Sequence, residues 1–279
     1  MEYKGTCSVN ADSTIYSCYS EEALIKIKNL WNKKYPHDKI KFNDGYNIWN
    51  SLKSKMKNTC DNERCWLNKK FISSGLPSEI YNYTFAPDEP TDWKENKWLS
   101  TEDIDIVMNH YEKKYKDFSF LGPSPINFDE KDEDGDYVWE ELYNFDIKKY
   151  LKKGKKNIGF VFNTDRHDGE GEHWVSMLIQ LKKDPFIFYF DSTGNNPPIE
   201  IKNFIEKVKK QFEELNIDIS IIQNKVKHQK KNTECGIYCI FMITNLIQDK
   251  LTYKNLCDKK NIISDNKMKE YRKVFYSIQ

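Results

Sequence analysis

The sequence lacks the features that mark a membrane, secreted or strongly charged protein. No apolar run reaches the roughly 18 residues of a membrane-spanning helix, and the opening MEYKGTCSVN contains no signal-peptide core. Neither charge is in excess, because 44 basic residues face 43 acidic ones and leave a net charge of +1. We therefore expect no membrane association and no strong or specific binding of nucleic acid.

Cysteines are few and do not follow the spacing of a small disulfide-rich scaffold. The chain has seven, an odd number, so we expect free thiols in a reducing compartment. Cys60 and Cys65 (CDNERC) are spaced like half a zinc site, but no second close Cys/His pair accompanies them. Packing in the core is the favoured interpretation of this pair, and we expect no metal and no other cofactor.

What the sequence does contain is typical of a packed globular protein. Hydrophobic residues make up 38% and aromatic residues 14%, which is enough for a core and unlike a disordered chain. Helical patterns occupy the first part of the chain, at 20–34, 45–57 and 62–73. The proline-rich stretch FAPDEPTDW at 85–93 indicates a boundary. We predict a mostly helical accessory domain over residues 1–92 and a second domain over residues 93–279.

The second domain is predicted to mix helices and strands. Ser100 and Asp103 have the N-cap and third-position spacing of a helix start, and this helix should run to residue 115. Further elements follow: strands at 158–163, 174–181, 186–190 and 219–225, and a helix at 199–215. The segment from Cys235 to Ile247 is apolar on most sides, which is typical of a buried helix. We therefore predict an α+β fold whose central helix begins at Cys235.

The segment NTECGIYCIF at 232–241 raises the question of a nucleophile. A thiol attacks effectively when its pKa falls, and a helix N-terminus or a neighbouring imidazolium has that effect. Cys235 lies where a polar segment meets the buried helix, whereas Cys239 lies one turn inside, where a thiol is normally a small hydrophobe. Gly236 lets a substrate approach the backbone closely. A metal pair of Cys235 and Cys239 is the alternative, but no further ligand is near.

Candidates for a general base, an orienting acid and an oxyanion donor lie at or near the ends of the predicted strands and helices. His173 lies where a Gly-rich turn enters a strand (EGEHWVSMLI), whereas its rival His167 (DRHDGE) resembles a solvated loop residue. Asp191 ends the next strand and lies beside His173 if the two strands pair. Gln229, six residues before Cys235, is spaced to donate its amide to an oxyanion.

These motifs resemble the ubiquitin-like-protein protease family, which includes the SUMO proteases and the adenovirus maturation protease. The resemblance rests on HW at a strand start, a strand ending in Asp191, and Q-x5-C-G-x-Y at 229–238. The segment WLSTEDI from Trp98 is similar to the start of the family's catalytic domain. FLGPSPINFDE, FNTDRHDGEGEHWVSMLI and CDNERCWLNKKFI are most similar to polyprotein-processing proteases of large cytoplasmic DNA viruses, of the African swine fever virus type.

The resemblance implies a papain-like, SUMO-protease-type catalytic domain with a set of site residues. They are Cys235 as nucleophile, His173 as general base, Asp191 as its orienting acid, Gln229 as oxyanion donor, and Trp98, Trp174 and Gly236 as substrate-binding residues. In the family a tryptophan at the place of Trp98 lines a narrow groove; helix packing is the alternative. The swine fever enzyme has Asn where this chain has Asp191, so the charge of the orienting group is not diagnostic.

The implied function is a cysteine endopeptidase that processes virion polyprotein precursors, with cleavage after Gly-Gly. Its partners would be protein substrates, and its location the virion and the virus factory in the host cytoplasm. Two alternatives stay open. An isopeptidase that removes ubiquitin-like modifiers would use the same residues, and a noncatalytic virion scaffold protein would have kept the fold without the chemistry.

Overall fold

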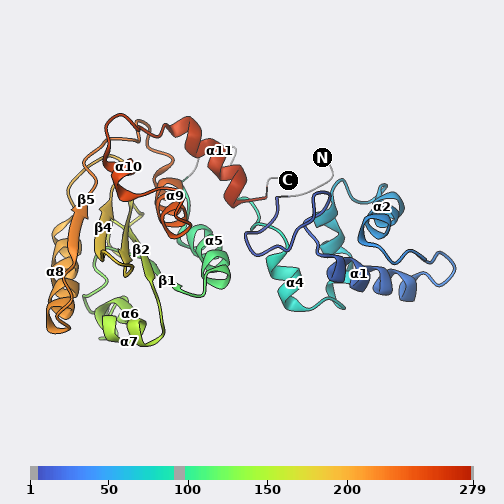
Figure 1. Ribbon diagram of the computed structural model, residues 1–279, viewed down its shortest axis with the longest axis horizontal. Helices are drawn as coiled ribbons and strands as arrows, with labels where there is room; N and C mark the ends of the chain where they lie inside the picture. The colour runs from blue at the N-terminus through green and yellow to red at the C-terminus, as the bar shows by residue number, and fades with distance from the viewer. Residues whose placement is uncertain (1–5, 91–97, 278–279) are drawn as a thin grey trace. The chain divides into compact units, whose positions relative to one another are not determined.

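The computed structural model describes residues 6–90 and 98–277, and the chain divides into two compact units. One comprises Met1–Glu89 with Lys273–Gln279, and the other comprises Pro90–Arg272 (Figure 1). The predicted boundary at residues 92 and 93 lies outside the described residues. Residues 273–277 group with the first unit, although the sequence assigns them to the second domain.

The first unit is helical. Its elements are α1 (Glu21–Lys34), α2 (Gly45–Met56), the 3-10 helix η1 (Glu63–Asn68), α3 (Lys70–Ser73) and α4 (Ser78–Tyr83). The helices predicted at 20–34 and 45–57 are confirmed. The single helix predicted over 62–73 is wrong, because Lys69 adopts an extended backbone with ψ 116° and separates η1 from α3. The unit has its own apolar core, in which Leu24, Ile48 and Trp66 are fully buried.

Two disulfides in this unit contradict the prediction of free thiols. Cys7 is bonded to Cys18 and Cys60 to Cys65, with Cα–Cα distances of 5.1 and 5.4 Å. The second bond also excludes the zinc half-site. The prediction failed because an odd cysteine count does not tell which sulfurs the fold brings together. The three remaining cysteines are free: Cys235, Cys239 and Cys257.

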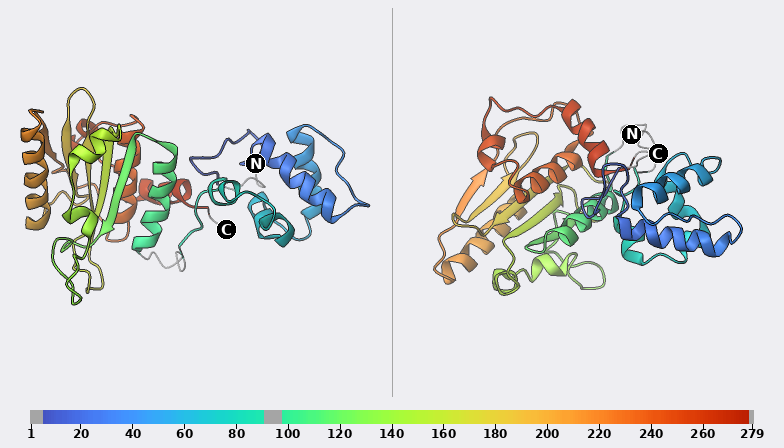
Figure 2. Two further views of the ribbon diagram at one scale, coloured as in Figure 1. Left: turned by 90° about the horizontal axis from the view of Figure 1, so that it is seen from below. Right: turned by 45° about the vertical axis from the view of Figure 1, so that its right-hand side comes forward.

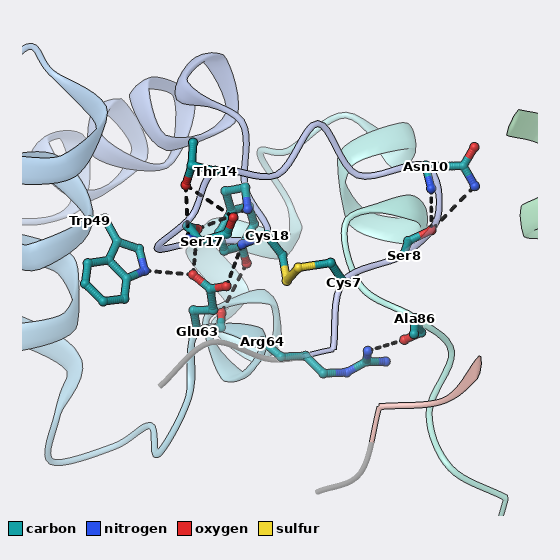
Figure 3. The surroundings of a disulfide bond; sticks show 11 residues. Cys7, Ser8, Asn10, Thr14, Ser17, Cys18, Trp49, Glu63, Arg64 and Ala86 are labelled. Carbon is teal, nitrogen blue, oxygen red and sulfur yellow. Dashed lines mark hydrogen bonds between the residues drawn. A yellow bond between two sulfur atoms is a disulfide. The ribbon is translucent and has the colours of Figure 1, made fainter. Parts of the chain in front are cut away.

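A buried carboxylate holds the segment that carries one of these disulfides (Figure 3). The side chain of Glu63 accepts hydrogen bonds from the Ser17 hydroxyl at 2.6 Å, the Cys18 N–H at 2.8 Å and the Trp49 indole at 2.7 Å. Glu63 is fully buried, and a buried carboxylate is tolerated where donors surround it. The N-terminal segment is therefore tied to η1 and α2 by hydrogen bonds as well as by sulfur.

The second unit is built on a five-stranded mixed sheet of order β1–β2–β3–β4–β5. The strands are β1 (Phe118–Ser124), β2 (Asn157–Asn163), β3 (Trp174–Gln180), β4 (Phe186–Phe190) and β5 (Ser220–Gln223). The outer pairs β1–β2 and β4–β5 are parallel, and β2–β3 and β3–β4 are antiparallel. The antiparallel pair β3–β4 brings the start of β3 beside the end of β4.

Helices cover both faces of this sheet. The helix α9 (Cys235–Ile247) packs against β2, β3 and α5 (Thr101–Lys114). The helix α8 (Ile199–Glu214) lies on the opposite face (Figures 1 and 2), where Phe204, Val208 and Phe212 pack against alternate residues of β2, β3 and β4. All 13 residues of α9 are buried. The predicted α+β fold with a buried central helix is confirmed.

The predicted elements of this unit are present with small shifts at their ends. Ser100 caps α5, its hydroxyl accepting the Asp103 N–H at 3.2 Å while the Asp103 carboxylate accepts the Ser100 N–H at 2.8 Å. Strand β1 was not predicted, since Gly122-Pro123 within it is typical of a turn. The short or polar helices were also missed: α6 (Glu140–Tyr143), α7 (Ile147–Lys152), α10 (Tyr253–Cys257) and α11 (Asp265–Phe275). None of the described helices is long and apolar enough to cross a membrane.

Candidate active site

Cys235 is the first residue of the buried helix α9. Its side chain is 1% exposed and free of any disulfide. Cys239 lies one turn further along, and burial, together with the negative charge of Cys235, raises the pKa of its thiol well above the ordinary value. Of the two sulfurs, Cys239 therefore has the environment of a neutral core thiol, and Cys235 stands at the helix start.

The pairing of β3 with β4 brings His173 and Asp191 together. Ser176 is opposite Phe190 in this antiparallel pair, so the residue just before β3 lies near the residue just after β4. The imidazole Nε2 of His173 and Oδ1 of Asp191 are 2.8 Å apart. Asp191 is 2% exposed, and its Oδ1 also accepts the Thr193 N–H and hydroxyl, both at 2.8 Å. The Asp191 carboxylate is thus held in place beside the imidazole.

The charges around His173 favour its protonated form. Burial alone would lower the pKa of His173, but hydrogen bonds to Asp191 and to Cys235, with the negative charges of both groups, raise it to about 10. Burial would raise the pKa of Asp191, but its hydrogen bond with His173, the imidazolium charge and the donors of Thr193 lower it. An imidazolium held between a carboxylate and a sulfur is the charge arrangement that thiol nucleophiles use.

Gln229 is held with its amide nitrogen available. It is 2% exposed; its Oε1 accepts the Ser192 hydroxyl at 2.6 Å, and its backbone N–H donates to the Ser192 carbonyl at 2.8 Å. Within residues 6–90 and 98–277, no protein acceptor hydrogen-bonds its Nε2. Because Ser192 directly follows Asp191 in the chain, one turn positions both the Asp191 carboxylate and the Gln229 amide.

Trp98 lines an open cleft of about 490 Å³ together with His173 and Gln229. Trp98 is 41% exposed, so its indole is accessible from the cleft. An indole on the wall of a cleft restricts the size of the residues that pass it. The sequence left packing open as an alternative for Trp98, and its exposure favours the substrate-binding interpretation.

Trp174 and Gly236 contact Leu99, the neighbour of Trp98, and neither lines this cleft. The Trp174 side chain is 5% exposed, and its indole N–H donates to the Leu99 carbonyl at 2.9 Å. A Cβ added at Gly236 would lie 3.1 Å from the Leu99 side chain, so the glycine makes room for that leucine. Both residues therefore position the backbone beside Trp98.

The loop between Gln229 and Cys235 is tied to α11, a contact that the sequence did not indicate. The carboxylate of Asp265 accepts the backbone N–H groups of Lys230 and Lys231, each at 3.1 Å. Arg272 Nε pairs with Glu234 Oε2 at 2.6 Å, with side-chain exposures of 5% and 0%. Glu234 directly precedes Cys235, and a charged residue before an apolar helix was the available signal. Asp265 thus fixes the start of this loop, and the ion pair between Glu234 and Arg272 fixes its end.

The remaining candidate groups lie outside the site. His167 is exposed and hydrogen-bonds Asn127, with 2.9 Å between ring Nδ1 and the amide. His228 is fully buried, its Nε2 bonded to the Leu256 carbonyl at 2.8 Å. In the part of the chain that the structure describes, no group of three or more His, Cys, Asp or Glu side chains is placed to hold a metal ion.

Asp191→Asn is expected to lower kcat/KM less than Asp191→Ala. The Asn carbonyl oxygen still accepts the imidazole N–H and keeps the ring oriented. Alanine removes a hydrogen bond and a negative charge that both raise the pKa of His173. In the wild type the imidazolium proton is lost as the pH rises through about 10, so in Asp191→Ala the alkaline limb of the rate profile moves to lower pH. Rates across the alkaline range measure both effects, and equal, near-complete losses in the two variants would show that the charge itself is required.

The fold and the arrangement of a thiol, an imidazole and a carboxylate define a cysteine peptidase. A family model described as Ulp1 protease family, C-terminal catalytic domain, matches residues 106–278. This is more than half of the 279 residues, and the chain belongs to that family. The predicted membership among SUMO-protease-type enzymes and the predicted thiol protease class are confirmed.

The curated proteins that are similar to this chain include proteases of two viruses. A protein of Acanthamoeba polyphaga mimivirus that is named as a thiol protease is 26% identical over 285 residues, covering 92% of this chain and 91% of that protein. A cysteine protease of African swine fever virus is 28% identical over 244 residues, covering 81% of this chain and 86% of that protein. The crystal structure of an African swine fever virus protease aligns with a TM-score of 0.71 at 21% identity, covering 100% of this chain and 97% of that chain. The structural match supports the fold.

Proposed function

We propose that this chain is an endopeptidase that cuts virion polyprotein precursors after Gly-Gly, and that Cys235, His173, Asp191 and Gln229 carry out the reaction. The observation that supports the reaction most is the contact of His173 with both Asp191 and Cys235 by hydrogen bonds, while Gln229 lines the same cleft as His173. The helix start supplies the thiol, the β3–β4 edge supplies the hydrogen-bonded imidazole and carboxylate, and the loop before α9 supplies an amide whose oxygen is already held by Ser192.

The mechanism is acyl transfer. The sulfur of Cys235 attacks the scissile carbonyl, and the oxyanion accepts hydrogen bonds from Gln229 Nε2 and the Cys235 backbone N–H. Because Nε2 of His173 is bonded to Asp191, the other ring nitrogen, Nδ1, faces the reaction and protonates the leaving amine. His173 then takes a proton from water, which attacks the thioester and releases the acid product and the thiol.

The virion location and the precursor substrates are part of this proposal, and the viral origin of the relatives supports them. We place the enzyme in the virion and in the host cytoplasm where virions assemble. The disulfides Cys7–Cys18 and Cys60–Cys65 favour the particle as its main site of residence, since the cytosol keeps thiols reduced.

Trp98→Ala is expected to relax the preference for glycine before the cut. In the wild type, replacing either glycine of a Gly-Gly-X peptide by alanine should lower kcat/KM by about 10–200-fold per methyl group in a tight passage, with valine worse. Trp98→Ala widens the passage, so the ratio between glycine and valine peptides falls, at some loss of rate from poorer positioning. Equal cleavage of glycine and valine peptides by the wild type would overturn both the groove and the Gly-Gly specificity.

The proposed reaction is tested by incubating the protein with candidate virion precursors and reading the new N-termini by mass spectrometry. New termini that follow Gly-Gly, absent with Cys235→Ala, support it. A ubiquitin-like modifier joined to a lysine side chain serves as the parallel substrate. Release of that modifier without cleavage of any precursor would establish the isopeptidase instead.

A further inference from the structure

The cleft beside the candidate site concentrates positive charge. Its lining includes Lys227, Lys230, Lys231 and Lys269, and of the described residues that line it, one, Glu172, is acidic. The chain as a whole carries a net charge of only +1, so this local excess does not reflect overall composition. A concave surface lined by one sign of charge focuses the field and draws in ligands of the opposite sign.

The side-chain ammonium groups of these lysines are not paired with any carboxylate of the described residues. Across residues 6–90 and 98–277, none of the four forms an ion pair, although Lys267 on the same helix as Lys269 pairs with Glu270 at 2.7 Å. The first three are exposed and Lys269 is partly exposed. Unpaired ammonium groups at the wall of a cleft are available to a ligand.

The backbone that carries the lysines is fixed beside the oxyanion donor. The N–H groups of His228 and Gln229 donate to the Ser192 carbonyl at 2.9 and 2.8 Å. Those of Lys230 and Lys231 donate to Asp265, which is 7% exposed. Lys269 stands one helical turn after Asp265 on α11. The lysines are therefore carried by a loop and a helix whose backbone is fixed by hydrogen bonds next to Gln229.

We propose that this basic cleft selects substrates whose scissile bond is flanked by aspartate or glutamate side chains. The inference rests on the proposed function, because it assigns Gln229 to the scissile carbonyl. Lys230 follows Gln229 directly, and an extended peptide advances about 3.3–3.6 Å per residue. The acidic side chains would then lie within roughly three residues of the cut.

A single-stranded nucleic acid also carries charges that lysines recognise. The shared lining favours a peptide, since Trp98, His173 and Gln229 line the same cleft. A strand seated there would exclude the peptide that the reacting groups require. Nucleic acid is therefore the competing occupant that the experiment must separate.

The experiment compares matched peptides around one Gly-Gly site, with Asp or with the isosteric Asn at each flanking position. Enzymes are the wild type, Lys227→Gln/Lys230→Gln/Lys231→Gln, and a control with the same charge change, Lys152→Gln/Lys153→Gln/Lys210→Gln, whose positions do not line the cleft. An exposed ion pair contributes about 0.2–1 kcal/mol, which corresponds to roughly 1.4- to 5-fold in kcat/KM per acidic residue. The readout is the Asp-to-Asn ratio at low and at high salt.

We expect a ratio above one in the wild type and the control, close to one in the cleft variant, and smaller at high salt. Equal kcat/KM for Asp and Asn peptides in the wild type, or an undiminished preference in the cleft variant, would overturn the proposal. So would a fluorescent single-stranded oligonucleotide that binds the wild type and not the cleft variant while the peptides show no preference.

Peptide binding to Cys235→Ala, followed by fluorescence anisotropy, separates this inference from the proposed function. If no Gly-Gly peptide is cleaved by the wild type, the proposed function fails. Tighter binding of the Asp peptide, lost in the cleft variant made in the same background, would still support the charge selection. Equal binding of Asp and Asn peptides would reject it independently of turnover.

Discussion

Cys235→Ala is expected to abolish peptide cleavage while the protein keeps its fold. The substitution removes the attacking sulfur and replaces it by hydrogen at a buried helix start, where alanine is a good helix former. Removing the nucleophile of a protease lowers kcat on the order of 10⁶-fold. Single-turnover cleavage of a Gly-Gly-X peptide measures the loss, and circular dichroism with thermal unfolding verifies that the fold persists.

Cys239→Ala is the matched control for this result. It deletes the same atom one turn further along α9, where burial raises the pKa of the thiol and keeps it neutral. We expect this variant to retain substantial activity after a modest loss of stability from the small cavity. Loss of turnover in well-folded Cys239→Ala, with activity retained in Cys235→Ala, would reverse the assignment.

The second unit could be predicted well because its candidate site residues lie at the ends of regular helices and strands. Strongly apolar strands and the apolar run after Cys235 have clear periodicity, so their positions followed from the sequence. Asp191 was predicted beside His173 on the condition that two strands pair, and the β3–β4 register meets that condition. The family resemblance supplied the roles, which residue spacing alone leaves open.

The helix α11 and its contacts with the site loop could not be predicted, because they depend on polar residues that are far apart in the sequence. Asp265 and Arg272 lie on a helix with few apolar residues, so neither its existence nor its contacts with the loop at 230–234 follow from periodicity. Ser192 was not predicted to hold the amide of Gln229. The disulfides Cys7–Cys18 and Cys60–Cys65 join residues only 11 and 5 positions apart. They were missed for another reason, because the odd cysteine count was taken to indicate free thiols.

Trp174 and Gly236 were correctly expected to lie near the site, but the residue that each contacts was not predicted. Both adjoin site residues in sequence, next to His173 and Cys235, and adjacency suggests contact with substrate. In the structure both meet Leu99. For Trp174 the reason is that neighbours on a strand face opposite sides. Gly236 lies on α9, where its missing side chain leaves room for Leu99.

His173→Ala is expected to lower kcat/KM by about 10²–10⁴-fold, the usual contribution of a general acid and base. The loss should be largest for peptides with a poor amine leaving group, because His173 supplies the proton that the departing amine needs. His167→Ala is the matched control: that ring is exposed, hydrogen-bonds Asn127 and lies on the loop before β3. It should retain most of the activity.

The pH dependence of the two variants distinguishes chemistry from structure. The proton on His173 is held up to about pH 10 by Asp191 and Cys235, so the wild-type rate should fall as the pH rises through that value. His167→Ala should show the same alkaline limb, whereas the residual activity of His173→Ala should show none there. An ester substrate, whose leaving group needs less protonation, should be cleaved by His173→Ala with a smaller relative loss than the amide. Equal losses for ester and amide, or an unchanged alkaline limb in His173→Ala, would mean that another group delivers the proton.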